Sequence, residues 1–513
     1  MNLPSSFIER TKQLMGESGC DALCEALQHD TPVSVRINSS KTDLVPSDAR
    51  HIPWTSNGYY LSFRPTFTFD PLFHAGSYYV QEASSMFVER AVKQYINTPV
   101  VALDLCAAPG GKSTLLRSAL PQGSFLVANE VMRNRSQILA ENIIKWGHPE
   151  VMVTSNDPAD FSSLEEIFDF ILTDVPCSGE GMFRKDEVAV EEWSPSNVQL
   201  CWERQRRILR DIWQCLKPGG ILIYSTCTFN REENEDNVLW ISEELGAEIL
   251  PVDIDDEWKI TGNLTGKDFP VYRFLPHKTE GEGLFLAVLR KKQSDNSYYS
   301  QDTDYSDEVE YDSRPDSRPD SRPDYRPDDK SGKKSDNKSD SRLAGRKKAG
   351  NNKSKSGKGK QQLPDIPSAV KNWINNPSEY SFHTDGSTIY AIPQKWSDLI
   401  NRFSDVLYVL HKGITIAETK GKDWQPNHSL AMSTGINREA FPEAELTYEQ
   451  AIAYLRKESV VLDPSLPKGY VLVTYRSTPL GFVKNIGNRA NNLYPQEWRI
   501  RSGYLPEEIR MVF

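Results

Sequence analysis

Two cysteines stand just past two predicted strands, where their thiols could do chemistry. Cys177 follows Asp174 in the string TDVPCSG, and Cys227 lies in the string YSTCTF. A lone cysteine at a strand end is more often a buried structural residue. Two of them at one edge, one beside an aspartate and a proline, favour a reactive site. Because the thiolate is the reactive form, such a site should lower the pKa of its nucleophile.

A loop with two glycines joins a predicted strand to a predicted helix in the string LDLCAAPGGKST. Its end resembles a phosphate-binding P-loop, but that motif needs a glycine at the position of Cys106, and the GxGxxG pattern is also missing. The loop therefore predicts a nucleoside cofactor without phosphates, for which S-adenosylmethionine (SAM) is the leading candidate. The expected contacts are Cys106, Ala107, Ala108, Pro109, Gly110, Gly111 and Lys112.

Two carboxylates follow the next two predicted strands and extend this ligand site. Glu130 ends the second strand, where an acidic side chain can accept both ribose hydroxyls. Asp157 follows the third strand and could accept the adenine amino group. Each alone is as readily a surface carboxylate, but their order after the loop favours the cofactor.

Strands alternate with helices through this part of the chain. Apolar runs predict strands at 100–105, 124–129, 151–154, 168–174 and 221–225, and helices at 135–146 and 197–216, the second ending at the string KPGG. This alternation is typical of an α/β, doubly wound, Rossmann-like domain with a parallel sheet. Ligands bind such sheets at the carboxyl ends of the strands, where the loop and both cysteines lie.

A stretch with very few apolar residues divides the 513-residue chain. Residues 302–329 hold eleven Asp and Glu against four Arg, and residues 330–360 hold twelve Lys and Arg against two Asp. Such blocks cannot form a core, so we expect a disordered linker at 294–362, either a plain spacer or a basic arm on RNA. The other predicted regions are an N-terminal extension (1–97), a catalytic domain (98–293) and a C-terminal domain (363–513).

The composition limits the remaining possibilities. The net charge of −11 argues mildly against nucleic acid, although a local basic groove would suffice. Seven scattered cysteines predict no disulfide framework, and Cys20 and Cys24, four residues apart on one expected helix face, form a poor metal site. With no long apolar run and no signal-like start, we expect a cytoplasmic protein without membrane or metal, and a monomer.

Cytosine chemistry would explain why two thiols are needed. Cytosine C5 is a poor nucleophile, but a thiolate that adds to C6 makes C5 enamine-like and able to attack a sulfonium methyl group. A base must then remove the C5 proton so that the thiolate can leave. Asp174 is placed to stabilise the adduct at N3 and N4, and the target base must leave its stack.

The strings LDLCAAPGGKSTLL, TDVPCSGEGMFRKD and PGGILIYSTCTFNREENEDNV closely resemble the Sun/NSUN family of RNA 5-methylcytosine methyltransferases. SVRINSS and FDPLFHAGSYYVQEASSM extend the resemblance over most of residues 30–290. It implies a SAM-dependent enzyme in which Cys227 is the nucleophile and Cys177 assists breakdown of the adduct. The loop from Cys106 to Lys112, with Glu130, Asp157 and Asp174, matches the family's SAM-contacting positions. Val175 stands where alanine is common, a slight departure.

The strings EGMFRK and LGFVKNIGNRANNLYPQEWRIR resemble the bacterial RsmF/YebU-like branch of that family. That branch implies a PUA-like RNA-binding C-terminal domain and a substrate in 16S rRNA of the small ribosomal subunit. Arg184 and Lys185 flank the pocket and are candidate RNA contacts, whereas Arg36 either contacts RNA or holds the N-terminal fold. Methylation of tRNA and a non-catalytic role in ribosome assembly are the alternatives. A phosphate-binding NTPase is the weakest alternative.

Overall fold

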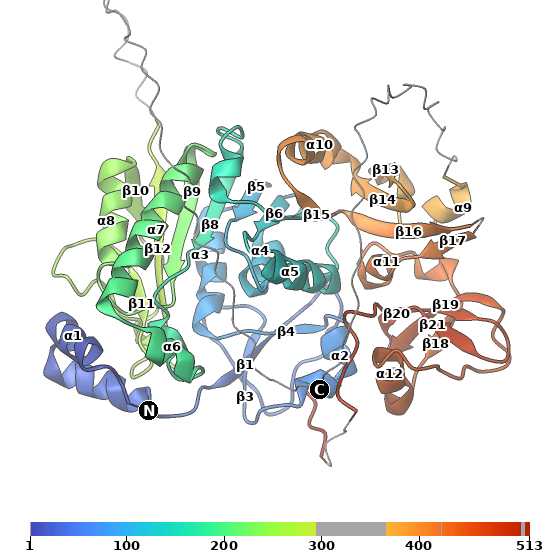
Figure 1. Cartoon of the computed structure of the whole chain (residues 1–513), viewed down its shortest axis with the longest axis horizontal. Coiled ribbons are helices and arrows are strands. Elements are labelled where there is room, and N and C mark those ends of the chain that lie inside the picture. Colours follow the sequence, from blue (N-terminus) through green and yellow to red (C-terminus); the bar gives the residue numbers. More distant parts are fainter. Residues whose placement is uncertain (1, 294–365, 422, 504–507) are drawn as a thin grey trace, which may run out of the picture. The chain divides into compact units, whose positions relative to one another are not determined.

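The computed structural model describes residues 2–293, 366–421, 423–503 and 508–513 (Figure 1). These ranges include both globular regions that the sequence predicts. The predicted acidic and basic linker, residues 294–362, lies outside the described residues.

A nine-stranded mixed sheet forms the centre of the first region. Its five middle strands lie in the spatial order β9-β8-β5-β6-β7 and are parallel to one another. They are β5 (Val101–Asp104), β6 (Phe125–Asn129), β7 (Val151–Thr154), β8 (Phe168–Asp174) and β9 (Leu216–Thr226). Every predicted strand falls within or around one of them, so the Rossmann-like prediction is confirmed for the centre of the sheet.

The outer strands depart from the predicted parallel sheet because they run antiparallel to their neighbours. On one side lie β10, β11 and β12, and on the other lies β15 from the C-terminal region. Their bounds are β10 (Ala247–Leu250), β11 (Tyr272–Phe274), β12 (Leu284–Lys291) and β15 (Val409–Lys412).

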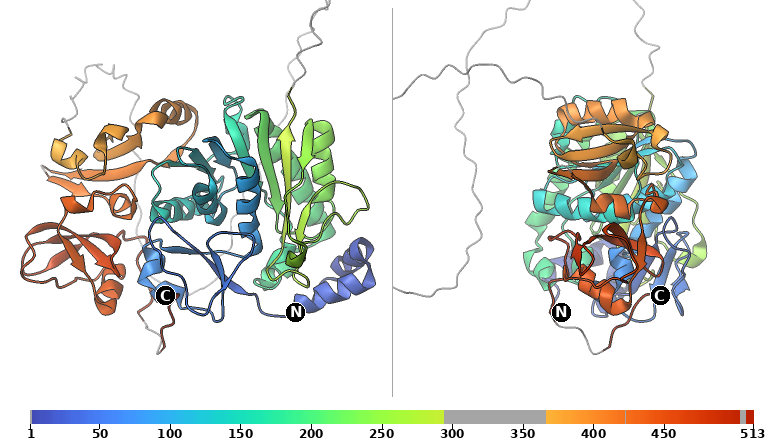
Figure 2. Two further views of the ribbon diagram at one scale, coloured as in Figure 1. Left: turned by 180° about the vertical axis from the view of Figure 1, so that it is seen from behind. Right: turned by 90° about the vertical axis from the view of Figure 1, so that its right-hand side faces the viewer.

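Helices cover both faces of this sheet (Figures 1 and 2). Neighbouring strand residues point to opposite faces, so Ala102 and Leu103 belong to two different cores. One core takes α3 (Val88–Tyr95), α4 (Gly111–Ala119) and α5 (Arg133–Trp146). The other takes α7 (Pro195–Trp213), α8 (Glu235–Glu244) and α10 (Ser397–Val406). The short α6 (Glu187–Glu192) precedes α7.

The string KPGG does not end a helix as predicted. Helix α7 ends at Trp213, and Lys217–Gly220 lies inside β9. The backbone explains this, since Leu216 is already paired with Phe168 and a register shift between Phe168 and Phe170 absorbs the glycines. The positive φ of Gly219, +78°, is one that glycine adopts without strain.

The N-terminal extension contains a long helix and a small sheet. Helix α1 (Ser5–Ala26) is interrupted at Gly16, whose φ is +77°. The sheet order is β2-β3-β1-β4. The remaining bounds are β1 (Val33–Ile37), β2 (Arg50–His51), β3 (Gly58–Leu61), β4 (Tyr78–Val80) and α2 (Pro71–His74).

Arg36 on β1 connects this sheet to the central domain through side-chain contacts. Its Nε donates to Gln81 Oε1 (2.9 Å), its Nη2 donates to Thr114 Oγ1 on α4 (2.6 Å), and its guanidinium lies 4.3 Å from the centre of the Trp146 ring. The residue is only 2% exposed, and burial lowers its pKa to about 9. Of the two roles predicted for Arg36, these contacts support the structural one, because a buried and paired guanidinium cannot reach RNA.

The C-terminal region contains two further four-stranded sheets, in the orders β13-β14-β16-β17 and β18-β19-β20-β21. The first consists of β13 (Tyr380–Asp385), β14 (Thr388–Pro393), β16 (Ile414–Lys420) and β17 (Asp423–Pro426). The second consists of β18 (Glu443–Glu445), β19 (Gly469–Tyr475), β20 (Thr478–Asn485) and β21 (Ala490–Asn492). The accompanying helices are α9 (Ser368–Lys371), α11 (His428–Met432) and α12 (Tyr448–Leu455).

A buried ion pair holds the segment that follows Cys227. Arg273 on β11 and Glu235 on α8 have side chains 1% and 0% exposed, with Nε donating to Oε1 over 2.7 Å. The Nη1 of Arg273 also donates to the carbonyl oxygen of Phe229 (2.8 Å). Removing one partner would leave the other charge buried without compensation.

We therefore expect Arg273→Ala to lower the free energy of unfolding by about 3–5 kcal/mol, measured by urea unfolding monitored by circular dichroism. Arg290→Ala is the matched control, because Arg290 and Glu248 form a pair whose side chains are 41% and 56% exposed. That control should lose less than about 1 kcal/mol. Equal losses in the two variants would contradict the role given to the buried pair.

Candidate active site

The predicted cofactor loop lies between β5 and α4 at the carboxyl edge of the sheet. The Ala107 backbone N–H donates to Asn129 O at the end of β6 (2.8 Å), and Arg135 Nη2 donates to Ala108 O (2.8 Å). Gly110 is the N-cap of α4 with φ +115°, and a Cβ there would lie 3.3 Å from Leu139 Cδ1. Glycine is thus required for the turn and for packing on α5. The seven predicted contact residues all belong to this turn or to the start of α4.

Asp104, the last residue of β5, is a site residue that the motif analysis missed. It is fully buried, and its Oδ2 accepts a hydrogen bond from Ser113 Oγ (2.6 Å). Its Oδ1 has no hydrogen-bond partner among the described residues. Burial raises the pKa of this carboxyl to about 7, and the Asp174 and Glu130 carboxylates contribute to the rise. This residue could have been found from the sequence, because Asp104 lies in an apolar strand and burying a carboxyl group there is energetically unfavourable unless it is compensated.

Glu130 follows β6 and lies next to the loop. Its Oε1 accepts from the Met132 backbone N–H (2.9 Å), and its Oε2 lies 3.3 Å from Arg135 Nη1. Arg135 therefore joins this carboxylate to the loop carbonyl at Ala108. The side chain of Glu130 is 4% exposed. The position predicted for ribose recognition is thus at the loop, with a cation bound beside it.

Asp157 follows β7, as predicted, but its carboxylate is engaged elsewhere. It accepts from the Ala159 backbone N–H (3.1 Å) and pairs with Arg207 Nη1 on α7 (3.1 Å). Burial opposes ionisation of Asp157, but the hydrogen bonds from Arg207 and Ala159 and the charge of Arg207 together outweigh burial and lower the pKa of Asp157. To accept an adenine amino group, this carboxylate would have to share its oxygens with Arg207.

The two cysteines predicted to react lie side by side. Strands β8 and β9 are parallel neighbours, and the register pairs Asp174 with Ser225 at their ends. The Sγ atoms of Cys177 and Cys227 are 3.0 Å apart, and both residues are partly exposed. The hydrogen bond to Cys227 and burial together raise the pKa of the Cys177 thiol well above its usual range. Cys177 is therefore protonated near neutral pH.

Lys112 and Asp174 form an ion pair beside the thiols. Lys112 Nζ lies 2.8 Å from Asp174 Oδ2, and Ser225 Oγ donates to Asp174 Oδ1 (2.8 Å). Burial alone would lower the pKa of the Lys112 ammonium, but Asp174 outweighs burial and Cys227 adds to the rise, so the pKa lies above the usual value. The lysine of the predicted cofactor loop thus pairs with the predicted catalytic residue Asp174.

Two buried glutamates connect the segments that follow the cysteines. Glu180 Oε2 accepts from the Asn230 backbone N–H (2.9 Å) and from that of Phe229 (2.6 Å). Glu233 Oε2 accepts from the Ser178 backbone N–H (3.0 Å), so each glutamate joins one cysteine segment to the other. Burial raises the pKa of Glu233 to about 7. In the string FNREENEDNV, which carries part of the family resemblance, these contacts give Glu233 a positioning role.

The candidate RNA contacts Arg184 and Lys185 lie near this site but are paired within the protein. Arg184 Nη2 donates to Gly281 O, and Lys185 Nζ pairs with Glu282. Burial lowers the pKa of Arg184. Any RNA contact by these two side chains would therefore compete with the segment around residue 281.

Cys20 and Cys24 lie on one face of α1, as predicted, with their Sγ atoms 3.9 Å apart. No group of three or more His, Cys, Asp and Glu side chains that could hold a metal ion occurs among the described residues. Within the same residues, none of the helices is both long and apolar enough to span a membrane.

The parallel-centred sheet, its helices on both faces and the loop at its carboxyl edge define a Rossmann-like domain, and the matches of the chain to known families identify it as a methyltransferase with a PUA-like C-terminal domain. Residues 96–290 match the model of the 16S rRNA methyltransferase RsmB/F family. Residues 3–83 match the N-terminal domain of 16S rRNA methyltransferase RsmF, and residues 441–500 match the methyltransferase RsmF PUA domain.

Full-length relatives agree with these matches. Ribosomal RNA small subunit methyltransferase F of Escherichia coli O6:H1 (strain CFT073) is 30% identical over 524 aligned residues, covering 98% of this chain and 97% of the relative. The protein of the same name from Aliivibrio fischeri (strain MJ11) is also 30% identical and is covered to 98%. The chain belongs to the RsmB/F family of 16S rRNA methyltransferases, within its RsmF group.

A solved structure supports the fold. The crystal structure of PH0851 superimposes with a TM-score of 0.50 at 24% sequence identity, covering 56% of this chain and 66% of that one.

The buried carboxyl of Asp104 should make stability depend on pH. Its pKa is raised in the folded state, so the folded protein binds more protons than the unfolded protein between about pH 4 and pH 7. Stability from this group is therefore lost as pH rises through that window. We expect the free energy of unfolding to decrease with rising pH less steeply in Asp104→Asn than in wild type, by on the order of 1 kcal/mol per pH unit.

Urea unfolding of wild type and Asp104→Asn at pH 5.0, 6.0 and 7.5 measures this difference. The other titrating groups are common to both proteins, so the difference isolates Asp104. A constant difference in the free energy of unfolding at all three pH values would show that Asp104 titrates normally.

Proposed function

We propose that this protein transfers a methyl group from SAM to C5 of a cytosine in 16S rRNA, through a covalent bond between Cys227 and C6 of the base. The observation that carries the proposal is the 3.0 Å separation of the Cys177 and Cys227 thiols beside the Lys112–Asp174 pair. One thiol can add to the pyrimidine while the other remains within reach of the adduct. Family membership supports the rRNA substrate.

The residues at the loop suit SAM by their chemistry. The carboxylates of Asp104, Glu130 and Asp174 lie at the ends of adjacent strands, and an anionic edge favours a cationic sulfonium. Glu130 would accept the ribose hydroxyls in place of its present contact with Arg135. The backbone from Cys106 to Gly111 would lie along the cofactor. When bound, SAM supplies an electrophilic methyl group.

The reaction needs Cys227 as a thiolate. Its sulfur forms a bond to C6, and the electron pair of the C5–C6 double bond then serves C5 as a nucleophile toward the methyl carbon. The Lys112–Asp174 pair would stabilise the adduct, with the Asp174 carboxylate accepting from the N4 amino group and the ammonium balancing charge near N3. A flipped-out base is required, since these atoms are hidden in a stack.

Release of the product requires the reverse bond change at C6. A water or hydroxide from the solvent takes the C5 proton, the electron pair of the broken C5–H bond re-forms the C5–C6 double bond, and the C6–S pair returns to Cys227, which leaves as a thiolate. Cys177 is the proposed assistant in this step because its Sγ is adjacent to the leaving sulfur. Glu180 and Glu233 hold the two segments at this spacing.

Transfer of tritiated methyl from SAM to 16S rRNA, 30S subunits and bulk tRNA, followed by nucleoside analysis, tests the function. Label recovered as 5-methylcytosine in the ribosomal samples is the expected result. Label in tRNA alone would keep the chemistry and replace the substrate. The absence of label in every RNA, with SAM binding intact, would favour a non-catalytic role in ribosome assembly.

The two cysteines should give opposite results when replaced. Cys227→Ala should abolish methyl transfer and covalent complex formation, because no thiolate adds to C6. Cys177→Ala should still add to RNA but release it slowly, so a protein–RNA adduct that survives denaturation should accumulate on gels. Cys24→Ala, a partly exposed cysteine on α1, is the control and should behave as wild type. An adduct in Cys227→Ala but not in Cys177→Ala would reverse the two roles.

A further inference from the structure

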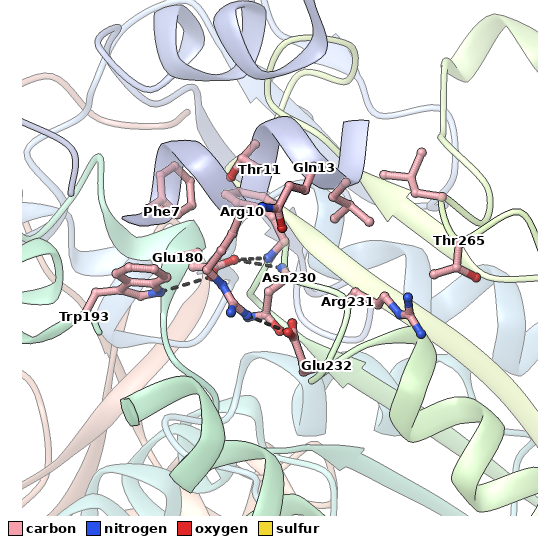
Figure 3. A pocket seen from close by; sticks show the side chains of 13 residues that line it. Phe7, Arg10, Thr11, Gln13, Glu180, Trp193, Asn230, Arg231, Glu232 and Thr265 are labelled. Carbon is pink, nitrogen blue, oxygen red and sulfur yellow. Dashed lines mark hydrogen bonds and ion pairs between the residues drawn. The ribbon is translucent and has the colours of Figure 1, made fainter. Parts of the chain in front are cut away.

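A cavity of about 350 Å³ lies between α1 and the segments that follow both cysteines (Figure 3). Helix α1 contributes one wall, and Glu180 and Phe229–Glu232 contribute another. Its volume is at the lower end of the range for small-molecule sites. Phe229 is two residues from Cys227, and Gly181 donates its backbone N–H to Cys227 O (2.7 Å). The cavity is therefore lined by the same chain segment that carries Cys227, although Cys227 itself does not line it.

The aromatic side of the cavity is rigid. Phe7 packs edge-on against Phe183 and Trp193, with ring centres 5.2 and 5.6 Å apart. Trp193 Nε1 donates to Glu180 Oε1 (3.1 Å), which fixes the indole. Figure 3 shows Phe7 and Trp193 together on one side of the cavity and Arg231 and Thr265 on the other. The cavity thus has an apolar wall, in which Phe7 and Trp193 are 1% and 4% exposed, and it also has polar lining residues.

The polar side carries both a donor and an acceptor. Arg10 Nη2 pairs with Glu232 Oε1 (2.7 Å), and the two side chains are 31% and 39% exposed. The Nε of Arg10 has no hydrogen-bond partner among the described residues. Two arginines and two glutamates line the cavity, so its formal charge is zero. A phosphate would meet the Glu232 carboxylate, whereas a nucleobase edge can accept from Arg10 and donate to Glu232.

We infer that this cavity receives the base of an unpaired nucleotide next to the target cytosine, and this inference rests on the proposed function. Proteins that read single-stranded RNA bind splayed bases against aromatic and arginine side chains and hydrogen-bond to their edges. An enzyme that flips out its target must also hold the neighbouring nucleotides. The cavity provides these features beside Cys227. Arg10 and Glu232 would recognise the base edge, and Phe7 and Trp193 would bound its face.

The test uses full-length protein and a short RNA centred on the cytosine mapped by the methyl-transfer experiment. Each nucleotide within three positions of that cytosine is replaced in turn by an abasic residue, and Kd is measured by fluorescence anisotropy. Wild type should bind one abasic RNA roughly tenfold more weakly than the intact RNA, because one base contact is lost.

Gln13→Trp places a large side chain at an exposed position of α1 that lines the cavity. This variant should bind the intact RNA roughly tenfold more weakly and no longer distinguish the abasic RNA. Glu9→Trp adds the same side chain at an exposed position of α1 outside the cavity and should match wild type. An unchanged KM for SAM in Gln13→Trp would show that the catalytic domain remains folded.

The inference is overturned if wild type binds all the abasic RNAs as it binds the intact RNA. It is also overturned if Gln13→Trp keeps the full response to the abasic residue. In both cases methylation of the intact RNA would continue, which separates this failure from failure of the proposed function. If no RNA is methylated at all, the proposed function and this inference fall together.

Discussion

The chemistry of this protein depends on the parallel pairing of β8 with β9. Parallel neighbours end at the same edge, and the register that pairs Asp174 with Ser225 brings two segments fifty residues apart in sequence into contact. The pairing of β8 with β9 fixes where the two cysteine segments begin, but it does not fix the path that each segment takes after its strand. Glu180 and Glu233 supply the remaining constraint by crossing from one segment to the other. Burying carboxylates is costly unless their oxygens are satisfied, so backbone donors and glutamates depend on one another.

The same edge concentrates negative charge next to Cys227, the proposed nucleophile, which must become a negatively charged thiolate to react. Asp104, Glu130 and Asp174 all raise the pKa of the Cys106 thiol in the loop, together with burial, which keeps that cysteine protonated. Lys112 supplies the opposing charge, because it pairs with Asp174 and interacts with Cys227. The lysine thus balances part of the negative charge at this edge. A cationic cofactor would act in the same direction.

The central strands could be predicted from the sequence because buried parallel strands are continuous apolar runs bounded by turns. The cofactor loop and the cysteine pair could be placed because they follow those runs directly. The partners of individual side chains could not be placed. The link from Asp157 to Arg207 joins residues fifty positions apart, and Arg36 reaches Thr114 across seventy-eight. Such contacts depend on how helices and sheets pack, which local patterns do not contain.

The KPGG string illustrates the same limit at the level of the backbone. Glycine and proline favour a helix end, but the chain after Trp213 had β8 available as a hydrogen-bond partner, and tertiary pairing prevailed over local preference. Strand β15 is a second case. Nothing in the string VLHK specifies which sheet it joins, yet it pairs with β7, and the Tyr408 backbone bonds Asn156 beside Asp157.

The C-terminal region therefore joins the central sheet through backbone hydrogen bonds between β15 and β7. Strand β15 begins at the carboxyl edge of the sheet, where the predicted cofactor carboxylates lie. The N-terminal region reaches the other end of the same edge, where α1 packs on the segments after Cys177 and Cys227. Both additions to the Rossmann-like core contact segments that carry predicted site residues. In the proposed covalent mechanism, the enzyme would hold its RNA through two chemical steps. Under the proposed function, contacts made by the segments that carry the two cysteines would couple RNA binding to the relative position of the two thiols during both steps.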